Sequence, residues 1–292
     1  MIKIILIIMT VFILYCMIET ARELRDFRLT KYRICSPKLN GIRGTKKIIF
    51  LSDLHNRMYG KENERLLKSI KNQHPDLILI GGDMLVRKDG NSYDRTVRFL
   101  EKLPAICPVY CANGNHEQKL KELPDKYEQS YEGYKKALTA CGIYMLENAS
   151  ETVRLDEAPV RISGLEIPLR AYARFGKKDL PLKEITDRIG EHGEEYQILF
   201  AHHPGYIQEY LEYGADLILS GHYHGGVMQL PGIGGVISPD FTLFPKYSGG
   251  IYREGTQTVV VSRGLGTHSV PVRLWNWPEL IVLELSGTSE EM

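Results

Sequence analysis

The fold is decided by the stretch Lys47-Ile-Ile-Phe-Leu-Ser-Asp-Leu-His55, in which an apolar run leads directly into side chains that can bind metal ions. A short apolar run bounded by charged and polar residues is typical of a strand buried on both faces of a sheet. Asp53 and His55 follow this run at the point where the chain would leave the sheet. The stretch therefore predicts a buried strand that ends in a carboxylate and an imidazole.

The same kind of apolar run recurs along the chain and alternates with helical patterns. Further buried strands are expected at 77–80, 108–111, 197–200 and 217–220, and helices at 62–71, 94–102, 126–140 and 207–213. This alternation is typical of an α/β fold whose layered sheet is covered on both faces. A second sheet is expected from residues 152–155, 161–165, 258–262 and 280–285.

Metal-binding residue types follow each strand of the first set. In chain order they are Asp53 and His55, Asp83, Asn115 and His116, His202 and His203, and His222 and His224. Ligands of open α/β sheets gather outside the carboxyl ends of the strands, so we expect these residues to converge on one site. Imidazole, carboxylate and amide donors together suit Mn, Fe or Zn better than Ca or Mg. The donors suffice for two divalent ions, the arrangement used by phosphatases.

Single residues of this set also have purely structural interpretations. Asp53 could cap a helix that begins near Leu54, and Asp83 could be a turn residue after Gly81-Gly82. Either interpretation explains one residue but not the repeated placement of ligand types after successive strands. The repetition favours one shared site.

The ordered blocks of sequence resemble a known superfamily. D-L-H, G-G-D, G-N-H-E, H-H-P and G-H-Y-H-G-G, between Asp53 and Gly226, are similar to the signature blocks of calcineurin-like metallophosphoesterases. The closing segments 261–266, 271–274 and 277–281 are similar to a subgroup of membrane-anchored bacterial phosphodiesterases, which includes relatives acting on UDP-2,3-diacylglucosamine. The resemblance implies a four-layer αββα sandwich with a dinuclear metal site.

The resemblance also implies a role for each matching residue. One ion would be held by Asp53, His55 and His224, the other by Asn115, His202 and His222, and Asp83 would bridge them. His116 would remain unliganded and would donate a proton to the leaving oxygen or stabilise developing charge. The nucleophile would be a water or hydroxide that bridges the ions. His203 is not expected to bind metal, because the family motif is His-x-Pro and Pro204 fixes its register.

Two departures from the family pattern concern the pocket around the metals. Tyr223 stands where the family commonly has threonine. Val227-Met228-Gln229 follows the final glycines, where glutamine usually comes sooner. The resemblance therefore implies the metal ligands more firmly than it implies the substrate pocket.

The N-terminus carries an uninterrupted apolar segment, because residues 4–18 include no charge. With its flanks it approaches the length that spans a bilayer, which predicts an uncleaved anchor; a cleaved signal peptide and a soluble helix are the alternatives. Lys and Arg follow the segment far more often than they precede it, so the body is expected on the cytoplasmic face of the cell membrane. The expected organisation is an anchor at 1–20, a basic juxtamembrane linker at 21–44, a phosphoesterase domain at 45–287 and a tail at 288–292.

Charge and cysteine content restrict the partners. The chain has 37 Lys plus Arg and 36 Asp plus Glu, a net charge of +1, so no overall field attracts nucleic acid. The 5 cysteines are scattered and indicate neither a disulfide framework nor a zinc knuckle. The leading hypothesis is a metal-dependent hydrolase of a phosphodiester or pyrophosphate, with manganese among the candidate ions and a lipid-linked substrate at the membrane. The alternatives are a non-catalytic metal-binding scaffold, a nuclease and a phosphomonoesterase.

Overall fold

Two mixed β-sheets form the centre of the protein, as seen in a computed structural model that describes residues 1–86, 92–126, 130–173, 179–230, 232–267 and 271–288. The first sheet runs in the order β1 (Arg28–Cys35), β14 (Glu279–Ser286), β2 (Lys46–Leu51), β3 (Leu77–Ile80), β4 (Val109–Cys111) and β5 (Ile143–Met145). The second runs β12 (Gly250–Glu254), β13 (Gln257–Val261), β9 (Leu217–Ser220), β8 (Tyr196–Ala201), β7 (Ala158–Leu165) and β6 (Ala149–Leu155). A short hairpin joins β10 (Gln229–Leu230) to β11 (Gly234–Gly235).

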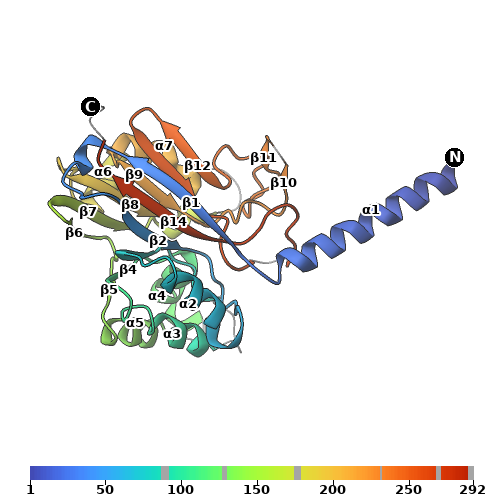
Figure 1. Cartoon of the computed structure of the whole chain (residues 1–292), viewed down its shortest axis with the longest axis horizontal. Helices are drawn as coiled ribbons and strands as arrows, with labels where there is room; N and C mark the ends of the chain where they lie inside the picture. The colour runs from blue at the N-terminus through green and yellow to red at the C-terminus, as the bar shows by residue number, and fades with distance from the viewer. Residues whose placement is uncertain (87–91, 127–129, 174–178, 231, 268–270, 289–292) are drawn as a thin grey trace.

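Helices cover the outer face of each sheet. On the first sheet lie α2 (Glu64–Lys71), α3 (Asp94–Leu100), α4 (Asn115–Glu122) and α5 (Tyr131–Ala140), and on the second α6 (Leu182–Ile189) and α7 (Ile207–Tyr213), as Figure 1 shows. Alternation along β2 divides its side chains between two cores, because successive residues of a strand point to opposite faces. Ile49 packs toward the helices, whereas Phe50 packs between the sheets and stacks on Phe200. The predicted two-sheet α/β fold is confirmed.

Four details of the predicted fold are wrong. Residues 197–200 and 217–220 were expected in the same sheet as the strand that begins at Lys47, but β8 and β9 lie in the second sheet. Residues 280–285 were expected in the second sheet, but β14 lies in the first, between β1 and β2. Residues 21–44 were expected to be a linker, but they include β1, which pairs with β14 along its whole length. The helix expected at 126–140 is α5, which begins at Tyr131, and residues 127–129 lie outside the described part of the chain.

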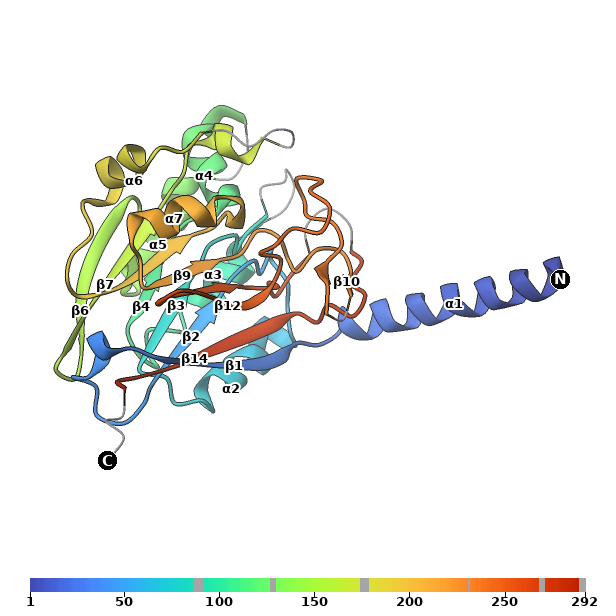
Figure 2. The ribbon, with the colours of Figure 1, turned by 90° about the horizontal axis from the view of Figure 1, so that it is seen from above.

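The N-terminal helix α1 (Ile2–Glu23) leaves the body at the end where β10 lies (Figure 2). Among the described residues it is the one helix long and apolar enough to cross a membrane, with a mean hydropathy of 2.4 and only 6% of its apolar window buried. Its length and composition fit a membrane anchor or a signal sequence. Its C-terminal end is fixed to the body, because the buried carboxylate of Glu23 accepts a hydrogen bond from the Asn276 backbone N–H (3.0 Å).

Candidate metal centre

The candidate metal centre lies where strands of both sheets end. β2, β3 and β4 run parallel in the first sheet, and β8 and β9 run parallel in the second, so each set of carboxyl ends meets at one edge. Asp53 and His55 follow β2, Asp83 follows β3, and Asn115 and His116 open α4 after β4. The second sheet contributes His202 after β8, and His222 and His224 after β9. These residues are all buried, although they come from segments far apart in sequence.

The first group of donor atoms joins Asp53, His55 and His224, whose ligand atoms lie within 4.8 Å of one another. Asp53 Oδ1 lies 3.3 Å from His224 Nε2 and 3.9 Å from His55 Nε2. The two imidazole nitrogens, His55 Nε2 and His224 Nε2, are 3.0 Å apart. This is the set that the family resemblance assigned to one ion.

The second group joins Asp83, His202 and His222 within the same 4.8 Å limit. Asp83 Oδ2 lies 3.2 Å from His202 Nε2 and 3.8 Å from His55 Nε2, so this carboxylate touches both groups. Asn115 lines the same cavity as His222 and His224, and its buried Oδ1 accepts no hydrogen bond from any described residue. A buried acceptor of this kind is normally satisfied, and a divalent cation is a fitting partner for it.

A third group places His116 with His55 and Asp83. The His116 and His55 rings meet edge to face, with their centroids 4.9 Å apart. The backbone N–H of His116 donates to Asp83 Oδ1 (2.8 Å), so the residue also orients that carboxylate. Distances alone allow His116 to be either a ligand or an unliganded neighbour of the metals.

Hydrogen bonds hold the donor atoms in position. Ser52 Oγ donates to Asp53 Oδ2 (2.5 Å), and the His222 backbone N–H donates to Asp53 Oδ1 (3.0 Å). His202 Nδ1 donates to the carbonyl oxygen of Gly81 (2.8 Å), which fixes the ring and leaves Nε2 to face the carboxylates. Outer bonds of this kind orient metal ligands and fix the histidine tautomer.

Backbone strain is concentrated in this site. A positive φ is uncommon for residues other than glycine, and such strained residues cluster at functional sites. Five of the predicted ligands have one: Asp53 (54°), His55 (47°), Asp83 (53°), His222 (64°) and His224 (52°). The chain packs tightly here, because a Cβ on Gly82 would lie 2.0 Å from the Gly114 nitrogen.

Burial shifts the acid–base properties of the site. Burial raises the pKa of Asp53 to about 6, although the imidazole of His202 acts in the opposite direction. Burial alone would lower the pKa of His202, but the Asp83 and Asp53 carboxylates raise it to about 10. Buried carboxylates are normally paired with positive charge or coordinate a metal. A divalent ion would therefore supply the positive charge that a protonated His202 otherwise gives these carboxylates.

Glu117 is a functional residue that the sequence reasoning missed, although it belongs to the G-N-H-E block. Its buried carboxylate accepts hydrogen bonds from the backbone N–H groups of Asp83 (2.8 Å), Met84 (2.8 Å) and Gly114 (3.0 Å). It thereby ties the loop after β3 to the start of α4. The signal in the sequence was its position, one residue after His116.

Glu117→Gln is expected to weaken metal binding by about 10- to 100-fold, the usual cost of losing an outer-shell partner of a metal ligand. The amide would turn an N–H group toward backbone donors that now meet a carboxylate oxygen. Titration of the metal-stripped protein with Mn²⁺ measures the change. Glu122→Gln, at an exposed position on the same helix, is the matched control. Equal affinity in the two variants would show that Glu117 does not position the site.

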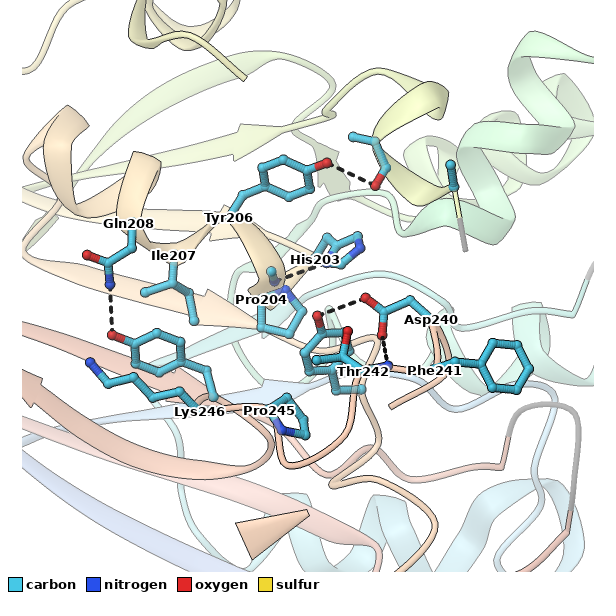
Figure 3. Close-up of a pocket in the computed structure, with 15 residues that line it drawn as sticks. His203, Pro204, Tyr206, Ile207, Gln208, Asp240, Phe241, Thr242, Pro245 and Lys246 are labelled. Atoms are coloured by element: carbon cyan, nitrogen blue, oxygen red, sulfur yellow. Dashed lines mark hydrogen bonds between the residues drawn. The ribbon is translucent and has the colours of Figure 1, made fainter. Parts of the chain in front are cut away.

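His203, next to His202, has a structural position. Its Nδ1 accepts a hydrogen bond from the Gly205 backbone N–H (3.0 Å) at the start of a short 3-10 helix. Its ring lines a cavity of about 510 Å³ together with Tyr206, Gln208, Asp240 and Lys246 (Figure 3). Across this cavity, Tyr223 Oη donates to Asp240 Oδ2 (3.1 Å). His203 belongs to none of the three donor groups in the described chain.

The chain is similar to known proteins over most of its length. Residues 46–226 match the family model for calcineurin-like phosphoesterases. The chain is similar to the uncharacterized metallophosphoesterase YkuE of Bacillus subtilis, with 30% identity over 248 residues that cover 83% of this chain and 80% of YkuE. It is also similar to the phosphodiesterase YaeI of Escherichia coli, with 26% identity over 262 residues that cover 89% of this chain and 88% of YaeI. The matched region includes every predicted metal ligand.

Proposed function

The chain belongs to the calcineurin-like phosphoesterase family, whose members are metal-dependent hydrolases, and we propose that its substrate is a membrane-associated phosphodiester or pyrophosphate. Its similarity to a relative named as a phosphodiesterase supports the diester over a monoester. The observation that carries the proposal is the position of Asp83, whose carboxylate oxygen lies within 4 Å of an imidazole from each donor group.

We assign two divalent ions to this site. Asp53, His55 and His224 would hold one, and Asn115, His202 and His222 would hold the other, with Asp83 between them. When bound, such ions supply positive charge that stabilises the oxygens of a phosphoryl group and lowers the pKa of water. Mn, Fe and Zn all suit these nitrogen and oxygen donors.

The protein's own contribution to the chemistry is positioning and proton transfer. Asp53 and Asp83 are held by backbone N–H groups, so their oxygens are oriented before any ligand arrives. His116 lies buried beside Asp83 and is the assigned proton donor to the leaving oxygen.

The membrane part of the proposal rests on α1. Residues 4–18 of the helix carry no charge, and their exposed apolar side chains need a lipid environment if the segment is retained. The excess of Lys and Arg after the helix favours the cytoplasmic face of the cell membrane. An enzyme held there can reach an amphiphilic substrate by lateral diffusion.

The proposed reaction is tested by metal analysis and by hydrolysis of bis-p-nitrophenyl phosphate, with the detergent-solubilised chain stripped and refilled with Mn, Fe, Zn or Mg. About two ions per chain and metal-dependent turnover are expected. Bound ions without turnover on any ester or pyrophosphate would favour a metal-binding scaffold. No bound ion would overturn the assignment of the site. Faster cleavage of nucleic acid or of phosphomonoesters would favour the nuclease or the phosphomonoesterase.

Deletion of residues 2–18 is expected to preserve hydrolysis of the soluble diester but to lower hydrolysis of a phospholipid diester in vesicles about tenfold or more, because anchoring raises the local concentration of enzyme at the substrate. The deletion spares β1 and also Glu23, whose partner Asn276 donates through Nδ2 to the His224 carbonyl (2.7 Å). The ratio of the two rates is the measurement. Equal loss on both substrates would argue against lateral access.

A further inference from the structure

An apolar cleft adjoins the candidate metal centre. Its volume is about 440 Å³, within the usual range for ligand pockets. Its lining includes three kinds of residue: the predicted metal ligands Asn115, His222 and His224, the apolar side chains Val227, Ile237, Phe241 and Val272, and the charged side chains Lys119, Asp240 and Arg273. An apolar group in this cleft would therefore lie next to a phosphate bound at the metals.

Three apolar side chains of the cleft are partly exposed to solvent. Val227 and Val272 are each 39% exposed, and Phe241 is 54% exposed. Phe241 also has a positive φ of 65°, a conformation that is strained for a bulky residue. Grouped and exposed apolar side chains mark a binding surface more often than single ones do.

The cleft lies at the same end of the body as α1. The Val227 carbonyl accepts a hydrogen bond from the Leu274 N–H (3.2 Å), and the next residue, Trp275, donates through Nε1 to the Tyr15 hydroxyl of α1 (3.1 Å). Figure 2 shows β10, which begins just after Val227, beside the base of α1. A membrane that holds α1 would therefore lie close to the cleft.

A neighbouring cavity shares part of this lining. It shares Tyr223, Asp240 and Phe241 with the cleft, but polar groups such as Gln208 and Lys246 line it further on. In Figure 3 the Asp240 carboxylate points into this cavity, whereas the Phe241 ring points away from it. The loop that carries these two residues thus lies between the two spaces.

We propose that the apolar cleft binds a hydrocarbon chain of the substrate, attached to the phosphate that the metal centre cleaves. Val227, Phe241 and Val272 are then residues that determine substrate specificity. This inference rests on the proposed phosphodiesterase function. It extends that function, because side chains of the protein, and not the membrane alone, would bind the hydrocarbon chain of the substrate.

The test compares 4-nitrophenyl ethyl phosphate with 4-nitrophenyl hexyl phosphate, using the Mn-loaded full chain in lipid nanodiscs. Each buried methylene is worth up to about fourfold, so kcat/KM for the hexyl diester is expected to be about tenfold higher or more. Calorimetry with hexylphosphonate and ethylphosphonate should show a similar ratio of affinities without turnover. Equal values for the two chain lengths in both measurements would overturn this inference, whereas no hydrolysis of either diester would overturn the proposed function itself.

Variants locate the effect in the cleft. Phe241→Ser and Val272→Asp are expected to bring the hexyl-to-ethyl ratio toward one in both measurements. Leu243→Ser is the matched control, because Leu243 is 64% exposed on the same loop but is not part of the lining of the cleft. It should retain the wild-type ratio. If both cleft variants kept the wild-type hexyl-to-ethyl ratio, or if Leu243→Ser lowered it as much as they do, binding of the hydrocarbon chain in this cleft would be contradicted.

Discussion

Asp83→Asn is expected to lower hydrolysis of bis-p-nitrophenyl phosphate on the order of 10³-fold and to reduce the metal bound per chain. The substitution removes one negative charge without changing the size of the side chain. Charge stabilisation by a bound metal is worth several kcal/mol in the transition state, and about 4 kcal/mol corresponds to a factor of 10³. Loss of one ion from the pair would therefore produce an effect of this size.

The geometry explains why a substitution of Asp83 should affect the whole site. Its Oδ2 lies near His202 of one donor group and His55 of the other, so the substitution affects both groups. Its Oδ1 accepts a hydrogen bond from the His116 backbone N–H, and an asparagine side-chain oxygen can accept the same hydrogen bond. The variant should therefore keep the loop conformation while losing the charge that attracts the cations.

Metal content by elemental analysis and steady-state turnover measure the two effects together. Asp187→Asn is the matched control, because this carboxylate is exposed and pairs with Lys183 on α6. The control should bind metal and hydrolyse substrate like the parent chain. If Asp83→Asn kept its full metal content and lost only turnover, Asp83 would not be the shared ligand.

The central strands could be predicted from the sequence because each is a short apolar run, and such a run forms a buried strand whatever its distant neighbours are. β1 was missed because its residues carry charge and only Ile34 is buried, so an edge strand looks like a solvated linker. β14 was placed in the wrong sheet because its apolar run would suit either sheet. Its position depends on pairing with β2 and β1, which are remote in sequence. Long-range pairing of this kind leaves no signal in the strand itself.

The candidate site was predicted more completely than its supports. Metal-binding residue types that follow successive strands can be predicted to share one site, because parallel strands bring their carboxyl ends together. The supports depend on side chain to backbone bonds across long separations, such as Glu117 to the Asp83 N–H and Asn276 to the His224 carbonyl. Glutamate and asparagine are common residues, and nothing in their sequence neighbours indicates which distant backbone groups they meet.

His116→Ala is expected to reduce turnover about 10²- to 10⁴-fold while the metal content stays unchanged, since general acid catalysis typically contributes that factor. The substitution removes the ring but keeps the backbone N–H that donates to Asp83 Oδ1, so the neighbouring carboxylate should remain oriented. The loss should be smaller for a 4-nitrophenyl ester than for an alkyl ester, because 4-nitrophenolate leaves without needing a proton.

This comparison of leaving groups separates the two roles that distance alone allows for His116. Its ring belongs to a donor group with His55 and Asp83, so His116 is close enough to bind a metal ion itself. If it were a ligand, His116→Ala would lose metal, and added Mn²⁺ would restore turnover on both esters equally. If it donates the proton, metal content stays constant and the alkyl ester loses more. Equal losses on the two esters at full metal content would contradict the assignment of His116 as the general acid, because that role alone predicts a dependence on the leaving group.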